Sequence, residues 1–317
     1  MELRTPITEL LDIRYPIVLA PMGGVSGGAL AQAVTAAGGL GLIATGYGDA
    51  EWIEHEFDAA GNARVGTGFI TWNLARKPEL LDLVLAREPA AVMLSFGDPA
   101  PFAAKIKGAG AKLICQVQTV RQAREAAQCG ADIVVAQGAE AGGHGASRGS
   151  FALIPAVADA VRPIPVLAAG GIADGRGLAA ALMLGAAGVL VGTRFYATPE
   201  ALGLDAAKER ITQATGDETA RTTVFDLVRG HDWPNVYTGR AVRNDFLERW
   251  HGHEDELAEN IERERERYKR AVREGDAAAT VVFAGEAVDL IHELEPAGQI
   301  VERIVREALE RLAQKPS

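Results

Sequence analysis

Eight short apolar runs alternate with helix-forming stretches between Pro16 and Gly192. The runs are almost continuously apolar, as in strands covered on both faces, and do not alternate between polar and apolar residues. Between them lie stretches such as "GALAQAVTAAG" and "TVRQAREAAQCG", which are typical of helices. The predicted strands are Pro16–Ala20, Gly39–Ala44, Arg64–Phe69, Ala90–Ser95, Lys112–Gln116, Asp132–Gln137, Pro165–Ala169 and Gly188–Gly192. Eight strands with eight connections predict an α/β fold, a (β/α)8 TIM barrel, with a doubly wound open sheet as the alternative.

The pattern changes after the eighth run. Residues 203–279 hold many aromatic and charged residues, including the run "ENIERERERYKRAVRE", which is typical of a solvated helix with Glu–Arg pairs. The apolar periodicity of "PAGQIVERIVREALERLAQ" then predicts the last barrel helix. We therefore predict a barrel formed by residues 1–202 and 280–317, with a smaller, mostly helical second domain, 203–279, inserted before the last barrel helix.

Composition narrows the class of function. A net charge of −10 disfavours a protein that must neutralise nucleic-acid phosphates. The most lipid-like run, Gly177–Gly192, is shorter than the roughly 20 residues of a membrane-spanning helix, and no secretory signal is visible, so we expect no membrane contact. Cys115 and Cys129 give no disulfide framework, which fits a cytoplasmic protein. Small-molecule chemistry is the expectation that remains.

Unusual residues follow the predicted strands at the end where barrel enzymes gather their functional groups. "APMGGVSGG" follows the first run, "TWN" the third and "QGAEAGGHG" the sixth. The loops after the seventh and eighth strands commonly bind phosphate through backbone N–H groups. Here they carry Gly170 and Gly171 in "AAGGIADGRG", and Gly192 and Thr193 in "VGTRF", with Asp174 as the expected N-cap of the next helix. These loops predict a ligand that carries a phosphate.

The motifs "APMGGVSGGALAQAVTAAGGLG", "QGAEAGGHG" and "PVLAAGGIADGRGLAAALMLGAAGVLVGTRF" resemble the nitronate monooxygenase family across the whole barrel. The resemblance implies FMN as cofactor, with its phosphate in the two glycine loops and no metal. It also implies that Gln116 stands where some members have a lysine, so that a positive contact to the flavin is missing there. The further flavin-contacting residues that it implies are Met22, Gly23, Asn73, Gln116, Gln137 and Gly142.

His144 is the candidate catalytic residue. It follows two glycines at the end of the sixth strand, and histidine titrates near neutral pH and is suited to proton transfer or anion binding. The family uses the matching histidine at its active site, which implies that His144 binds a nitronate or takes the α-proton of a nitroalkane. Electron transfer to FMN and oxygen chemistry on the substrate would then give a carbonyl compound and nitrite. Glu140 is either a partner of this histidine or a cap of the turn.

Other functions stay open at this point. An FMN-dependent enoyl-acyl-carrier-protein reductase that uses NAD(P)H, or an NADH:quinone reductase, would share the same motifs. A non-flavin aldolase or isomerase barrel would need a lysine or paired carboxylates at the strand ends, which the chain lacks, and a pure binding module leaves His144 unexplained. The expected partners are a nitronate and O2, with a second copy of the chain as a candidate and no nucleic acid.

Overall fold

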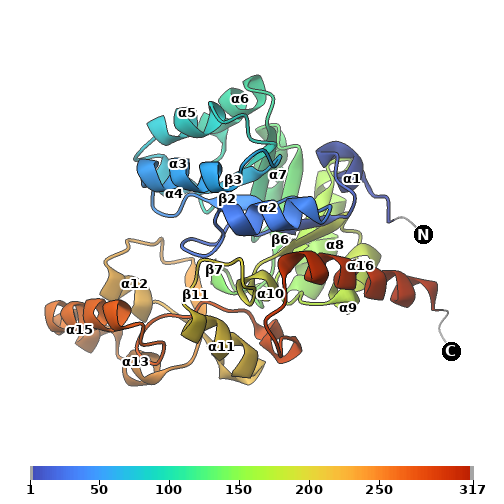
Figure 1. Ribbon diagram of the computed structural model, residues 1–317. Helices are drawn as coiled ribbons and strands as arrows, with labels where there is room; N and C mark the ends of the chain where they lie inside the picture. The colour runs from blue at the N-terminus through green and yellow to red at the C-terminus, as the bar shows by residue number, and fades with distance from the viewer. Residues whose placement is uncertain (1–2, 315–317) are drawn as a thin grey trace.

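Eight parallel strands form the centre of the computed structural model, which describes residues 3–314 (Figure 1). Their order in the sheet is β1-β9-β8-β6-β5-β4-β3-β2. Leu40, just before β2, forms two backbone hydrogen bonds with β1. The N–H of Leu19 donates to the carbonyl oxygen of Leu40 at 2.9 Å, and the N–H of Leu40 donates to the carbonyl oxygen of Ile17 at 3.0 Å. The ring is thereby closed, and the predicted barrel is confirmed. The strands are β1 (Ile17–Leu19), β2 (Leu42–Ala44), β3 (Gly66–Ile70), β4 (Ala91–Ser95), β5 (Lys112–Val117), β6 (Ile133–Gln137), β8 (Val166–Ala169) and β9 (Gly188–Val191).

Helices surround the strands. Asp174 accepts hydrogen bonds from the N–H groups of Arg176 and Gly177, so it is the N-cap that the sequence predicts. The last helix packs on the helices that follow the first and seventh barrel strands and so occupies the place of the eighth barrel helix. The surrounding helices are α2 (Gly28–Ala36), α3 (Ala50–Ala59), α5 (Glu79–Leu85), α6 (Ala100–Gly108), α7 (Val120–Gln128), α8 (Ser150–Val161), α9 (Gly175–Met183) and α16 (Ala297–Ala313), with the short α4 (Thr71–Leu74) and α10 (Thr193–Tyr196) at strand ends.

The two faces of each barrel strand bury different layers of apolar side chains. Val18 belongs to the inner cluster of the barrel, whereas its neighbours Ile17 and Leu19 belong to the outer layer under the helices. Helix α1 (Pro6–Leu11) contributes Ile7 and Leu11 to the inner cluster. This two-sided burial explains why the strands are apolar throughout in the sequence.

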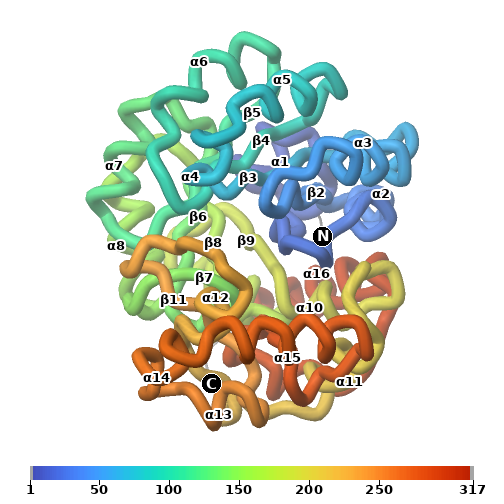
Figure 2. The backbone as a smooth tube through the Cα atoms, turned by 90° about the vertical axis from the view of Figure 1, so that its left-hand side faces the viewer, coloured from blue at the N-terminus to red at the C-terminus, as the bar shows by residue number. Residues whose placement is uncertain are grey.

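The segment between β9 and α16 gathers on one side of the barrel (Figure 2). It has its own buried cluster, in which Val224, Phe225, Leu247, Leu257 and Tyr268 take part. Its elements are α11 (Asp205–Gln213), η1 (Gly216–Glu218), β10 (Thr219–Thr222), α12 (Val224–Arg229), β11 (Thr238–Val242), α13 (Asp245–Trp250), α14 (Glu254–Glu259), α15 (Ile261–Glu274) and η2 (Glu286–Leu290). The charged run is the helix α15, as predicted, and the segment is mostly helical.

A second sheet, which the sequence did not reveal, joins this segment to the barrel. Its antiparallel order is β10-β11-β7, and β7 (Gly143–Gly145) belongs to the loop after β6. Phe283 forms a further bridge with β11, so pairing with the segment continues past residue 279. The division at 202/203 and 279/280 stays a prediction.

No helix within residues 3–314 has the length and apolar character needed to cross a membrane.

Candidate active site

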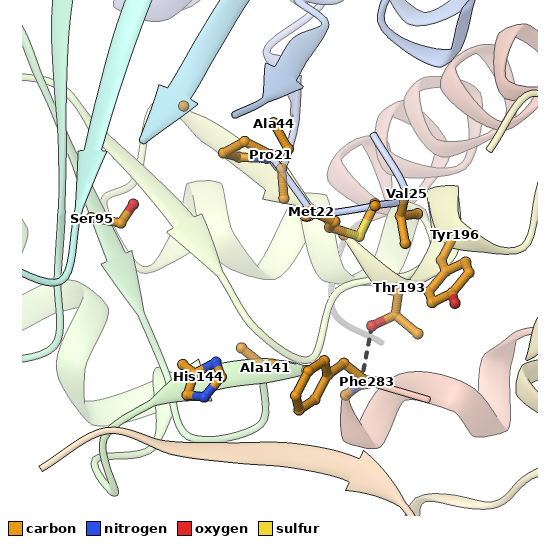
Figure 3. Close-up of a pocket in the computed structure, with 18 of the residues that line it drawn as sticks. Pro21, Met22, Val25, Ala44, Ser95, Ala141, His144, Thr193, Tyr196 and Phe283 are labelled. Atoms are coloured by element: carbon orange, nitrogen blue, oxygen red, sulfur yellow. Dashed lines mark hydrogen bonds between the residues drawn. The ribbon is translucent and has the colours of Figure 1, made fainter. Parts of the chain in front are cut away.

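A cavity of about 570 Å³ opens at the carboxyl ends of the barrel strands, within the range of about 300–1,000 Å³ that is usual for cofactor and substrate pockets. Figure 3 shows Met22 and Val25 on one side of it, His144 and Phe283 on the other, and Thr193 between them. The predicted site residues that line the cavity are Met22, Gly23, Gln116, Gln137, Gly142, His144, Gly170, Gly171, Gly192 and Thr193.

Asn73 is the one predicted site residue that is not among the residues lining this cavity. It lies in α4, directly after β3, as expected from its place in the chain. A Cβ atom on Gly48 would lie 3.4 Å from Asn73 Nδ2, so the side chain faces the loop after β2. The structure therefore puts Asn73 beside the rim, and its contact with a flavin stays a prediction.

The loops after β8 and β9 form a backbone cradle. Gly170 and Gly171 both have positive φ angles, +100° and +72°, which favour glycine. Thr193 Oγ1 accepts a hydrogen bond of 3.0 Å from the N–H of Gly285, the bond drawn as a dashed line in Figure 3. Because α10 begins at Thr193, right after β9, a short helix starts where phosphate sites of barrels are commonly formed.

Two further glycines of the cavity wall border open space. Gly24 and Gly143 line the cavity, and a Cβ atom on either would meet no protein atom within 4 Å. At Gly142, in contrast, a Cβ atom would lie 2.6 Å from the backbone of Ala284 and Gly285. The glycine-rich loop after β6 is thus packed by backbone on one side and leaves open space on the other.

Gln137 links three elements through hydrogen bonds. Its Oε1 accepts from Gln116 Nε2 at 3.0 Å and from Gln118 Nε2 at 2.8 Å. Its Nε2 donates to the carbonyl oxygen of His144 at 3.0 Å. The side chain of Gln137 therefore fixes the backbone at His144. Gln116 donates to this network and brings no positive charge to the position, as a lysine would.

His144 is buried and paired with a residue of the inserted segment. Its Nε2 lies 2.8 Å from Asp226 Oδ2, and each of the two side chains is 7% exposed. The Asp226 carboxylate accepts a hydrogen bond from Nε2–H, so that in the neutral ring Nδ1 is the nitrogen without a proton. Nδ1 has no hydrogen-bond partner among residues 3–314. The ring thus has one fixed nitrogen and one that is free to act on a ligand.

Aromatic rings hold the imidazole from its face and edges. Trp233 stacks on it with a centroid separation of 3.5 Å and an interplanar angle of 4°, and its indole N–H donates to the Tyr47 hydroxyl at 2.9 Å. Phe96 and Phe283 approach the same ring at 6.5 and 5.4 Å. Such contacts restrict the ring to a narrow range of orientations.

His231 and Tyr47 stack on each other beside this cluster, with ring centroids 3.8 Å apart. Burial, together with the nearby positive charge of Arg229, lowers the pKa of His231 to about 4. Burial also raises the pKa of Tyr47 above its usual value. Both groups are therefore neutral near pH 7.

Glu140, for which the sequence left two roles open, caps a helix. Both of its carboxylate oxygens accept from the N–H of Ser150 at 3.0 Å, and Oε2 also accepts from the Ser150 hydroxyl at 2.8 Å. Ser150 is the first residue of α8, where a carboxylate satisfies free N–H groups. The partner of His144 is Asp226 instead.

Sequence reasoning missed Asp226, Arg229 and Trp233, which all lie in "FDLVRGHDWP". The signal available was the density of charged and aromatic side chains in this stretch, which comprises most of α12 and the start of the loop that leads to β11. Asp226 and His144 are 82 residues apart, so only the tertiary structure shows that they pair.

Comparisons with known proteins identify the family and similar folds. A model of the nitronate monooxygenase family matches residues 4–64 and 72–307. A nitronate monooxygenase of Neurospora crassa is 35% identical over an alignment that covers 93% of this chain and 89% of that protein.

Two solved structures are similar over almost their full length. FabK from Thermotoga maritima has a TM-score of 0.86 and 33% identity, with 98% of this chain and 97% of that chain covered. A nitroalkane oxidase from Streptomyces ansochromogenes has a TM-score of 0.80 and 30% identity, with 97% and 99% covered.

Proposed function

The chain belongs to the nitronate monooxygenase family, and on that premise we propose that it is an FMN-dependent oxidoreductase that converts alkyl nitronates and O2 to a carbonyl compound and nitrite. The observation that carries this proposal is the buried His144–Asp226 pair at the edge of a cavity framed by glycine loops. It provides a base of fixed orientation where the substrate would meet the cofactor.

The residues present fit FMN. The N–H groups at Gly170, Gly171 and Thr193 are the candidates for its phosphate, and the open space beside Gly24 and Gly143 is the candidate place for its ring system. Gln116 and Gln137 are the candidates for its polar edge. When bound, FMN supplies the electron acceptor and the link to oxygen, while the chain orients the substrate and excludes water.

His144 handles the proton. With a neutral nitroalkane, the α C–H bond breaks, the proton moves to Nδ1 and the electron pair is delocalised over the carbon, nitrogen and oxygens of the resulting nitronate. Asp226 accepts the hydrogen bond from Nε2–H throughout and stabilises the imidazolium that forms. A nitronate supplied as such needs no proton removal and binds directly.

The test is anaerobic mixing of the purified holoprotein with a nitronate, NADH and NADPH in turn, with the flavin absorbance recorded. We expect yellow protein that releases FMN on denaturation and whose flavin is reduced by the nitronate. Rapid reduction by NADH or NADPH, with no response to the nitronate, would assign the chain to the reductase alternative. Colourless protein that takes up no added FMN would contradict the cofactor itself.

A further inference from the structure

Arg229 is the only Lys, Arg, Asp or Glu among the cavity-lining residues that the structure describes. It is the last residue of α12, one helical turn after Asp226. Within residues 3–314 its side chain has no ion pair and no hydrogen bond, and Nη1 is buried without a partner. A buried charged donor without a partner is costly, so the position points to an anion that arrives with a ligand.

Two rings hold the guanidinium without occupying its N–H groups. Arg229 Cζ lies 5.9 Å from the ring centroid of Tyr47 and 5.8 Å from that of Phe283, within cation–π range. Phe283 also borders the imidazole of His144. The rings therefore hold Arg229 near His144, and they engage the face of the guanidinium, so that its N–H groups have no partner among residues 3–314.

Resting on the proposed function, we propose that Arg229 binds the negatively charged oxygens of the substrate. A nitronate is a planar anion whose two oxygens match the fork of guanidinium N–H groups, as a carboxylate does. The cavity would thereby select small molecules that carry a planar anionic oxygen group, with the apolar remainder against the surrounding rings.

Charge balance supports this role. When His144 takes the α-proton of a neutral nitroalkane, one positive and one negative charge form in a largely apolar cavity. Asp226 faces the new imidazolium, and Arg229 is the cation left for the nitronate, because His231 is neutral near pH 7. Each new charge then has a partner, which is needed in surroundings of low dielectric constant.

The test compares Arg229→Gln, Arg229→Lys and the control Arg249→Gln in FMN-loaded protein. Arg249 is an exposed arginine of the same segment and also lies over an indole ring, 4.8 Å from the ring of Trp250, so the control makes the same chemical change away from the cavity. Calorimetric titration with nitrate, a planar anion that does not react, measures anion binding without turnover. Kinetics with a preformed nitronate and with the neutral nitroalkane measure the role in the reaction.

We expect Arg229→Gln to weaken nitrate binding and to lower kcat/KM for the nitronate about 10- to 100-fold, the usual size of a charge-assisted hydrogen bond. For the neutral nitroalkane, kcat should fall while KM changes little, because the charge appears only as the proton leaves. Arg229→Lys should recover part of both losses, and Arg249→Gln should behave as wild type.

The outcomes separate this inference from the proposed function. If nitrate binding depends on Arg229 but no nitronate is oxidised, the anion site stands and the proposed function falls. If nitronates are oxidised and Arg229→Gln matches Arg249→Gln in both readouts, the function stands and the anion site is refuted. Loss of FMN binding in both Arg229 variants, with nitrate binding kept after FMN is supplied in excess, would assign Arg229 to the cofactor and also overturn the inference.

Discussion

The barrel rim and the inserted segment contribute to the cavity in different ways. The barrel loops provide mainly backbone and small residues, such as Gly23, Gly170 and Gly171. The segment provides the charged and aromatic side chains Arg229 and Trp233, with Asp226 behind the histidine. Under the proposed function, backbone of the barrel loops holds the cofactor, and the segment adds side chains that act on the substrate together with His144 of the barrel. His144 lies where the two meet.

Replacing His144 by alanine tests the residue at which the barrel rim and the inserted segment meet, and this substitution should have the largest effect. We expect turnover to fall about 10²- to 10⁴-fold, the usual contribution of a general base, while FMN stays bound because glycine backbone holds it. The turnover rate should fall more with neutral nitroalkanes than with preformed nitronates. The ratio of these two decreases is the measurement. Equal activity of mutant and wild type on both substrates would remove His144 from the mechanism.

Asp226→Asn tests the contribution of the segment alone. The amide keeps the shape but removes the charge that stabilises the protonated ring, so kcat for a neutral nitroalkane should fall about 10- to 100-fold. The change should be smaller for a preformed nitronate. Asp255→Asn, an exposed carboxylate of α14, is the control. Similar losses on both substrates would mean that Asp226 supports only the fold.

Gly171→Val tests the contribution of the barrel alone. A valine at φ +72° strains the loop, by about 1–3 kcal/mol, and should displace the N–H groups of the cradle. We expect FMN affinity to fall about tenfold, with kcat of the flavin-saturated enzyme retained. The control is Gly110→Val, at φ +84° in the loop before β5 at the opposite end of the barrel, which should lose stability but not FMN affinity. Equal FMN affinity in both variants would move the phosphate elsewhere.

His231→Phe tests the contact surface between the two regions and should have the smallest effect. Because the pKa of His231 is about 4 when folded and about 6.5 when unfolded, the unfolded chain binds a proton that the folded chain does not, and stability is lost as pH falls from 6.5 to 4. Phenylalanine removes this loss and can still stack on Tyr47. The fall in Tm over this pH range should be about 2 °C smaller than in wild type. His253→Phe, an exposed position, is the control, and identical pH slopes in both variants would contradict the burial of His231.

The sequence predicted the barrel well because its strands are buried on both faces and are therefore visible as apolar runs. The glycine loops at Gly170 and Gly171 also stand out in the sequence, and both line the cavity; that they bind a phosphate stays a prediction. The sheet that β7 forms with β10 and β11 was missed: "GHG", "TART" and "TGRAV" are short and carry no clear alternation. Asp226 and Arg229 looked like ordinary residues of a charged region, because the burial of Asp226 and of Arg229 Nη1 depends on packing against distant parts of the chain.

The pairing of β7 with β11 limits how this protein can be recombined with its relatives. His144 stands opposite Gly239, where a Cβ atom would lie 2.7 Å from the ring of Phe283. A one-residue slip of β11 would turn the paired side chains to opposite faces of the sheet. A chimera that takes its barrel from one parent and its segment from another must therefore keep the length of β11 and a glycine opposite the histidine. The position of the candidate base, His144, therefore depends on strand register as well as on the identity of one residue.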